Sequence, residues 1–275
     1  MQLKHRFFHP TAMTRLATRV MSYAFFAPIL LQGQEGPVRL EPLEQYAVEF
    51  TTEEGFFDGL LIRQSPAEPG AWKGSGLKVD AERGVVLWDS SRKNASWNQV
   101  VLQPPLALAN SDWAEVRLKV DFELNRFSRS FETKGSRRIC VLALTTSPKP
   151  YDRDAVRFEA ALTENDGKLY WSPLTTGVDS DFGRAGIYVR ALTELPEDNL
   201  IPIELVLHRD FSTGKVRGMI ASRNPRQGRV ESPILHVPDI LAAKDLYLAL
   251  IFGNAEKLQG SEVAIDSVRF SVEHP

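Results

Sequence analysis

The chain has 275 residues, with 33 basic and 35 acidic side chains and a formal net charge of −2. Apolar residues make up 43% of it and charged residues 25%, values that exclude a disordered, collagen-like or coiled-coil protein. No apolar run approaches the roughly 18 residues of a membrane span, and the balanced charge argues against nucleic-acid binding, which needs a basic surface.

Residues 1–34 predict a signal peptide. They hold basic side chains but no acid, and they lead into an apolar run from Val20 to Leu31 that ends in a short QGQ exit. Met13 is an alternative start to Met1. A buried N-terminal helix is the other interpretation, and Pro28 inside the run disfavours it. We therefore expect a secreted, periplasmic or cell-surface protein with no membrane span in its mature chain.

A single cysteine, Cys140, lies in the apolar segment RRICVLAL. One cysteine cannot form an internal disulfide, and no base lies nearby in the chain, so a buried hydrophobic role is expected. Export without disulfides suits a bacterial protein whose stability comes from a hydrophobic core.

Residues 35–45 (EGPVRLEPLEQ) are polar and proline-rich and are expected to form a strap, and residues 46–275 to form one domain. Within that domain the apolar residues alternate with period two, most clearly over Ala114–Leu124, where the helical period does not fit. The charged residues of this segment, from Glu115 to Glu123 and including Asp121, are expected to form a solvated outer strip. The helical pattern is confined to Pro238–Lys244. The predicted strands are Tyr46–Phe50, Gly76–Asp80, Val85–Asp89, Trp97–Leu102, Ala114–Leu124, Arg138–Thr145, Ala155–Thr163, Lys168–Pro173, Gly186–Leu192, Ile201–His208, Lys215–Ser222, Leu246–Phe252 and Val263–Val272.

This many strands with so little helix predicts an all-β, two-sheet antiparallel sandwich. The order of its segments resembles the concanavalin A-like lectin/glucanase jelly rolls over residues 46–273. The resemblance is carried by the VEF strand, Asp58-Gly59, the hairpin Gly76–Trp88, QPPLAL at 103–108, the hairpin Ile203–Ile220 and the closing Val263–Phe270. It implies two stacked, curved sheets with ligands on the concave face, in a superfamily that includes both lectins and enzymes.

The catalytic signatures that the resemblance implies are absent. The glucanases carry a Glu-x-Asp-x-x-Glu strand, and here Asp154 and Glu159 have an odd spacing that places them on opposite strand faces. The alginate lyases carry Gln-x-His, which does not occur. Weak catalytic candidates are Glu159, Glu204 and His208; the last two share a strand face, which alternation predicts to be solvent-facing.

Aromatic and planar polar side chains suit sugar binding, because rings stack on sugar C–H faces while amides, guanidinium groups and carboxylates bond hydroxyls. The candidate ligand-binding residues, on polar strand faces, are Trp97, Arg157, Tyr170, Tyr188 and Arg190. The resemblance also implies a structural calcium between the first and last strands, for which Glu49 and Asp266 are the matching residues.

Three functions remain open. The first is an exported, non-catalytic carbohydrate-binding or cell-surface module, with a polysaccharide as its partner. The second is a divergent polysaccharide-degrading enzyme, either a glycoside hydrolase or a polysaccharide lyase. The third is a structural envelope protein without a sugar ligand. Fold alone does not choose among them.

Overall fold

The computed structural model describes residues 45–64, 71–74, 76–89, 98–103, 105–106, 113–126, 137–176, 186–192, 199–237, 240, 245–253 and 261–275. Regular structure within these residues is almost entirely β-strand, with short 3-10 turns such as η1 (Leu61–Arg63). None of the helical turns in this part of the chain has the length and apolar character needed to cross a membrane.

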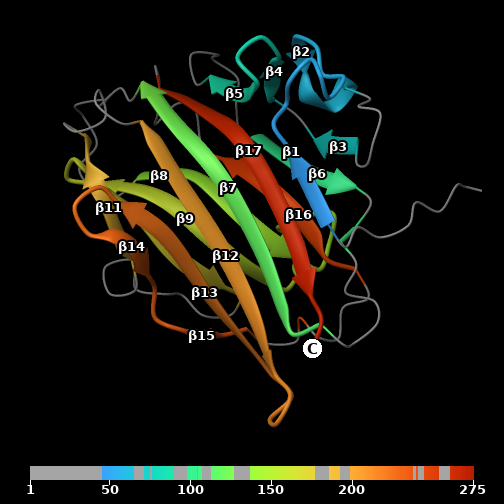
Figure 1. Cartoon of the computed structure of the whole chain (residues 1–275), viewed down its shortest axis with the longest axis vertical. Helices are drawn as coiled ribbons and strands as arrows, with labels where there is room; N and C mark the ends of the chain where they lie inside the picture. The colour runs from blue at the N-terminus through green and yellow to red at the C-terminus, as the bar shows by residue number, and fades with distance from the viewer. Residues whose placement is uncertain are drawn as a thin grey trace, which may run out of the picture. The chain divides into compact units, whose positions relative to one another are not determined.

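The strands form two antiparallel sheets (Figure 1). The ten-stranded sheet has the order β14-β13-β12-β7-β17-β5-β4-β2, with β1 beside β17 and β15 beside β13. Its strands are β1 (Gln45–Val48), β2 (Gly59–Leu60), β4 (Lys78–Asp80), β5 (Val85–Asp89), β7 (Glu115–Arg126), β12 (Leu200–Asp210), β13 (Lys215–Asn224), β14 (Gly228–Glu231), β15 (Leu235–His236) and β17 (Glu262–Glu273). The seven-stranded sheet has the order β11-β10-β9-β8-β16-β6-β3. Its strands are β3 (Ala71–Gly74), β6 (Asn98–Gln103), β8 (Arg137–Thr145), β9 (Arg157–Asn165), β10 (Lys168–Thr175), β11 (Ile187–Ala191) and β16 (Tyr247–Phe252).

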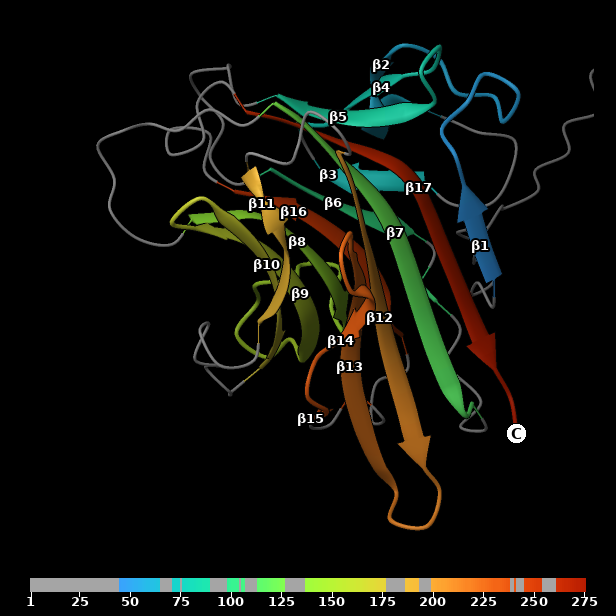
Figure 2. The ribbon, with the colours of Figure 1, turned by 60° about the vertical axis from the view of Figure 1, so that its left-hand side comes forward.

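The two sheets pack face to face, as β7, β12 and β13 do against β8, β9 and β10 in Figure 2. Aromatic pairs join them: the ring centroids of Phe122 and Trp171 lie 5.4 Å apart, and those of Trp88 and Phe252 lie 5.6 Å apart. The period-two alternation explains this arrangement, because every second residue of β7, from Val116 to Leu124, is buried in the shared core.

Each predicted strand overlaps an observed one, and the all-β, two-sheet antiparallel prediction is confirmed. The first predicted strand is too long by two residues, since β1 ends at Val48. Phe50 has a left-handed backbone (φ 56°), which breaks the strand. Its fully buried ring, 5.4 Å from that of Phe56, holds this unfavourable conformation in place.

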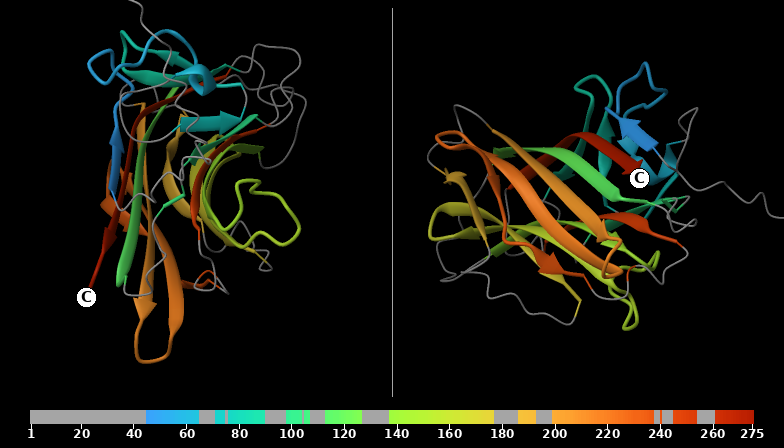
Figure 3. Two further views of the ribbon diagram at one scale, coloured as in Figure 1. Left: turned by 90° about the vertical axis from the view of Figure 1, so that its right-hand side faces the viewer. Right: turned by 60° about the horizontal axis from the view of Figure 1, so that its bottom comes forward.

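The seven-stranded sheet bends so that its outer face is concave (Figures 2 and 3). The centre of that face is not open to solvent. A small apolar cluster there is nearly or fully buried, and it consists of Val101, Val141, Ala143, Ala161, Ala249 and Ile251. A ligand on this side of the protein would therefore meet the rim of the concave face rather than its centre.

Candidate functional site

The residues selected from the sequence fall on opposite sides of the sandwich. Arg157 and Glu159 lie on β9, and their alternation with the core residue Phe158 places them on the concave outer face of the seven-stranded sheet. Glu204 and His208 lie on the outer face of the ten-stranded sheet. The structure therefore does not bring the three catalytic candidates into one groove. Trp97, residues 1–44 and most of Pro238–Lys244 lie outside the described residues.

Glu159 is a buried carboxylate held by an arginine. The Nε of Arg157 donates a hydrogen bond to its Oε1 at 2.7 Å, and Nη1 of the same arginine donates to the carbonyl oxygen of Pro150 at 2.7 Å. The Arg157 guanidinium also stacks 5.1 Å from the Tyr151 ring centroid. Burial raises the pKa of Glu159, and the charge and hydrogen bond of Arg157 only partly oppose this. This cluster ties the 146–155 loop to the sheet.

Tyr170 and Tyr188 meet at the edge of the same face. They are partners in the β10–β11 ladder, both half-buried, with ring centroids 5.7 Å apart in an edge-on arrangement. Leu169 pairs with Arg190 and Tyr170 pairs with Tyr188, so a β-bulge lies between the two pairs. Val189 is its extra residue.

Arg190 differs from its prediction because of this bulge. The sequence places it on the polar face with Tyr188, but the bulge shifts the alternation and pairs it with the core residue Leu169. Its side chain is 2% exposed, and Nη2 donates a hydrogen bond to the carbonyl oxygen of Leu200 on β12 at 2.5 Å. Arg190 therefore joins the two sheets and does not face the rim.

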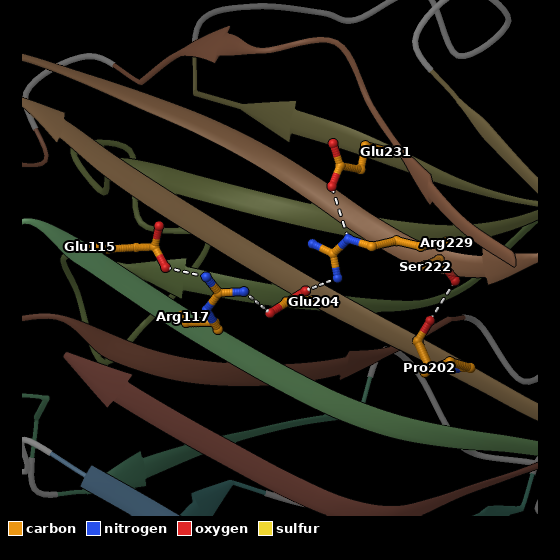
Figure 4. Close-up of polar contacts among 7 residues, drawn as sticks. All are labelled: Glu115, Arg117, Pro202, Glu204, Ser222, Arg229 and Glu231. Atoms are coloured by element: carbon orange, nitrogen blue, oxygen red, sulfur yellow. Dashed lines mark hydrogen bonds and ion pairs between the residues drawn. The ribbon is translucent and has the colours of Figure 1, made fainter. Parts of the chain in front are cut away.

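Glu204 lies between two arginines on the opposite side of the protein (Figure 4). Its Oε1 accepts a hydrogen bond from Arg117 at 2.5 Å and its Oε2 accepts one from Arg229 at 2.6 Å; these arginines also contact Glu115 and Glu231. Burial raises the pKa of Glu204, but the two arginines lower it more, so the net pKa is below its ordinary value. A carboxyl group that stays ionised is a poor general acid.

Two hollows adjoin Glu204 on this outer face, and both include Lys119. The first has a volume of about 400 Å³ and is lined by Lys119, Asp121, Leu200, Pro202, Ile203, Glu204, Ala221, Ser222, Arg223 and Arg229. The second has a volume of about 540 Å³ and is lined by Gln45, Tyr46, Ala47, Arg117, Lys119, Glu204, Arg269, Phe270 and Ser271. We call the two together the outer groove. Sequence reasoning missed it: the alternating charges of Glu115–Glu123 indicated only a solvated strip, and cross-strand neighbours are not visible in one strand.

His208 is exposed at one end of the same face. It is paired in register with Arg217 on β13 and with Glu115 on β7. The carboxylate of Glu115 accepts a hydrogen bond from Arg117. The sequence expectation that it shares a solvent-facing strand face with Glu204 is confirmed.

The predicted calcium residues lie close to a guanidinium group. Arg269 donates to Glu49 at 3.1 Å, and its Nη1 lies 3.9 Å from Asp121, which also accepts a hydrogen bond from Ser267 at 2.9 Å. Burial raises the pKa of Asp266, and the charges of Asp121 and Glu49 raise it further. Among the described residues no group of three acidic, histidine or cysteine side chains is placed to hold a metal. This geometry suits the arginine and does not fit a calcium ion.

Neither a protein-family model nor a curated protein matches the sequence. Solved structures are similar in fold. A basic winged bean lectin with Tn-antigen is 11% identical, with a TM-score of 0.53 over 84% of this chain and 98% of that one. A winged bean acidic lectin with methyl-alpha-D-galactose is 11% identical, with a TM-score of 0.52 over 84% and 99%. A GH43 glycoside hydrolase is 9% identical, with a TM-score of 0.50 over 90% of this chain and 44% of that one. The chain has the concanavalin A-like jelly-roll fold of the lectins, as its sequence pattern predicts.

Proposed function

We propose that the protein is an exported, non-catalytic carbohydrate-binding module. The observation that carries the proposal is the pair Tyr170 and Tyr188, which the lectin-like fold places at the rim of the concave face. Two half-buried rings there offer an apolar surface for the C–H face of a sugar and hydroxyl groups for its polar edge. Export is supported by the basic, acid-free start and the apolar run of residues 1–34.

The carboxylates support binding over catalysis. Sugar hydrolysis by the usual route needs two carboxyl groups across one glycosidic bond, at most about 10 Å apart. Glu159 and Glu204 point away from each other on the outer faces of different sheets, and each is engaged by arginine. Because a GH43 glycoside hydrolase is among the similar structures, degradation of a polysaccharide is the alternative that the experiment must test.

The test uses the full chain with neutral, uronic and sulfated polysaccharides, followed by size-exclusion chromatography of both protein and polymer. Co-elution with intact polymer supports the proposal, and shortened polymer contradicts it. Tyr188→Ala should weaken binding roughly two- to tenfold, the amount expected when one aromatic contact is removed. Phe211→Ala, which removes a ring that is 53% exposed on the β12–β13 turn, is the matched control and should leave binding unchanged.

A further inference from the structure

The outer groove is built from six strands of the ten-stranded sheet. Lys119 and Glu204 belong to both of its hollows, so the hollows adjoin and extend from β1 across β17, β7 and β12 to β13 and β14. Each has the volume of a small-molecule site. The groove is deepened at Ala221 on β13, where the side chain is small. Ala221 is paired in register with Glu204 on one side and with Glu231 on the other. An extended ligand can therefore lie across the sheet.

The acids in the groove are already paired. Glu204 is held by Arg117 and Arg229. Asp121, only 8% exposed, has Lys119 at 3.3 Å and accepts a hydrogen bond from Ser267. These carboxylates have little remaining capacity to bind a cationic ligand.

The cations that line the groove remain open to solvent, although Lys119, Arg229 and Arg269 each contact an acid. The side chains of Lys119, Arg229 and Arg269 are 43%, 52% and 48% exposed. Arg223 is exposed and directly opposite Arg229 in the β13–β14 ladder, so two like charges face each other. Within the described part of the chain the side chain of Arg223 has no hydrogen bond or ion pair. An anionic group bound between Arg223 and Arg229 would relieve the repulsion between the two like charges.

We propose that the outer groove binds an acidic sugar chain through its carboxylate or sulfate groups, with Arg223, Arg229 and Lys119 as the main contacts. Arginine forks and the lysine ammonium form charge-assisted hydrogen bonds with such oxygens. Leu200 and Pro202 line the same hollow and offer apolar surface to sugar C–H groups. Among the described residues that line the groove, the aromatic ones are Tyr46 and Phe270, which are 5% and 3% exposed, so neither ring is available to stack on nucleic-acid bases.

This inference rests on the proposed carbohydrate function, but it uses a different surface. The rim tyrosines belong to the seven-stranded sheet and the groove to the ten-stranded sheet. The two can therefore fail separately.

The experiment measures binding of the full chain to three probes of equal length by isothermal titration calorimetry: an oligogalacturonate, a sulfated dextran oligosaccharide and a neutral dextran oligosaccharide. The expected result is binding of an acidic probe that weakens as salt rises and falls about tenfold or more in Arg223→Gln. Arg153→Gln removes an exposed arginine from the β8–β9 connection and should have no effect. Ala221→Leu should also weaken binding, because it fills the groove without changing charge, and circular dichroism checks its fold.

The three probes and the Arg223→Gln variant distinguish the possible outcomes. Binding of the sulfated probe alone, or of the uronate alone, supports the inference and identifies the acidic group. Acidic probes that bind equally to wild type and Arg223→Gln overturn it, since the contacts then lie elsewhere. Binding of the neutral probe alone overturns it while leaving the carbohydrate proposal intact, and binding of no probe overturns both.

Discussion

Gly218 on β13 is the place where the packing of the two sheets can be tested most sharply. A Cβ atom at this position would lie 2.7 and 2.8 Å from two ring atoms of Phe158, on the opposite sheet, and 2.8 Å from Cγ2 of Val237. Phe158 is fully buried and Val237 is 2% exposed, so neither has free space to move into. Overpacking of this kind destabilises a protein by about 1–3 kcal/mol. Replacing glycine by alanine stabilises it by up to about 1 kcal/mol, because the unfolded chain loses conformational entropy. We therefore expect Gly218→Ala to lower the free energy of unfolding by about 1–2 kcal/mol.

Urea unfolding followed by tryptophan fluorescence measures this loss, and the melting temperature should fall by roughly 2–8 °C for a domain of this size. A double-mutant cycle with Phe158→Leu identifies the cause, because removing ring atoms should reduce the cost of the added methyl group. Gly214→Ala is the control. Its Cβ would meet nothing within 4 Å, and its cost comes from its backbone (φ +65°), so it should be the same in both backgrounds. The packing described here would be refuted if the Gly218→Ala protein were as stable as wild type. It would also be refuted if Gly218→Ala lowered the free energy of unfolding by the same amount in the Phe158→Leu background.

Three further predictions concern titratable groups. The pKa of Glu159 is raised in the folded protein, so this carboxyl group ionises in the unfolded chain first as pH rises above about 4.3. Glu159 therefore makes the wild-type protein less stable as pH rises toward 7. Urea unfolding at pH 4 and pH 7 should show that Glu159→Gln removes this loss of stability. Glu204 has the opposite sign: its lowered pKa gives stability that is present at pH 7 and lost as pH falls through the folded pKa. Glu204→Gln should therefore cost roughly 1 kcal/mol at pH 7, since its partners are 38% and 52% exposed, and progressively less in acid. Burial raises the pKa of the Cys140 thiol, so maleimide should label the native protein far more slowly than the urea-unfolded protein; equal rates would contradict its position in the core.

The strands were predictable because their burial follows a strict local period. In β7 the apolar residues at even positions, from Val116 to Leu124, are all buried in the core, and the sequence carries that alternation directly. The strands β2, β3, β14 and β15, which are two to four residues long, were missed. The strands β1 and β4 are as short, but they lie within alternating segments of five residues, Tyr46–Phe50 and Gly76–Asp80, that the sequence does show. The missed strands pair because neighbouring strands offer them open edges, which is a property of the assembled sheet.

The site was less predictable because its geometry depends on register. Nothing near Arg190 in the sequence indicates the bulge that turns its side chain into the core. Asp121 was expected on a solvated face, but it is only 8% exposed and accepts a hydrogen bond from Ser267, which is 146 residues away. Likewise the position of Glu204 between Arg117 and Arg229 joins three strands whose pairing is set by the whole fold.

Burial of the inner face of each sheet explains how one sandwich can carry two separate binding surfaces. The core fixes the inner face of each sheet, so substitutions that serve a ligand fall on the outer faces, where they leave the packing of Phe122 against Trp171 unchanged. On the concave side the buried apolar cluster leaves only the rim, where aromatic rings gather. On the other side the sheet is covered by long charged side chains, and Arg223 lies opposite Arg229 with no acidic partner among the described residues. A neutral sugar face and an acidic group would therefore be recognised on opposite sheets, and a variant that removes one recognition should leave the other at full strength.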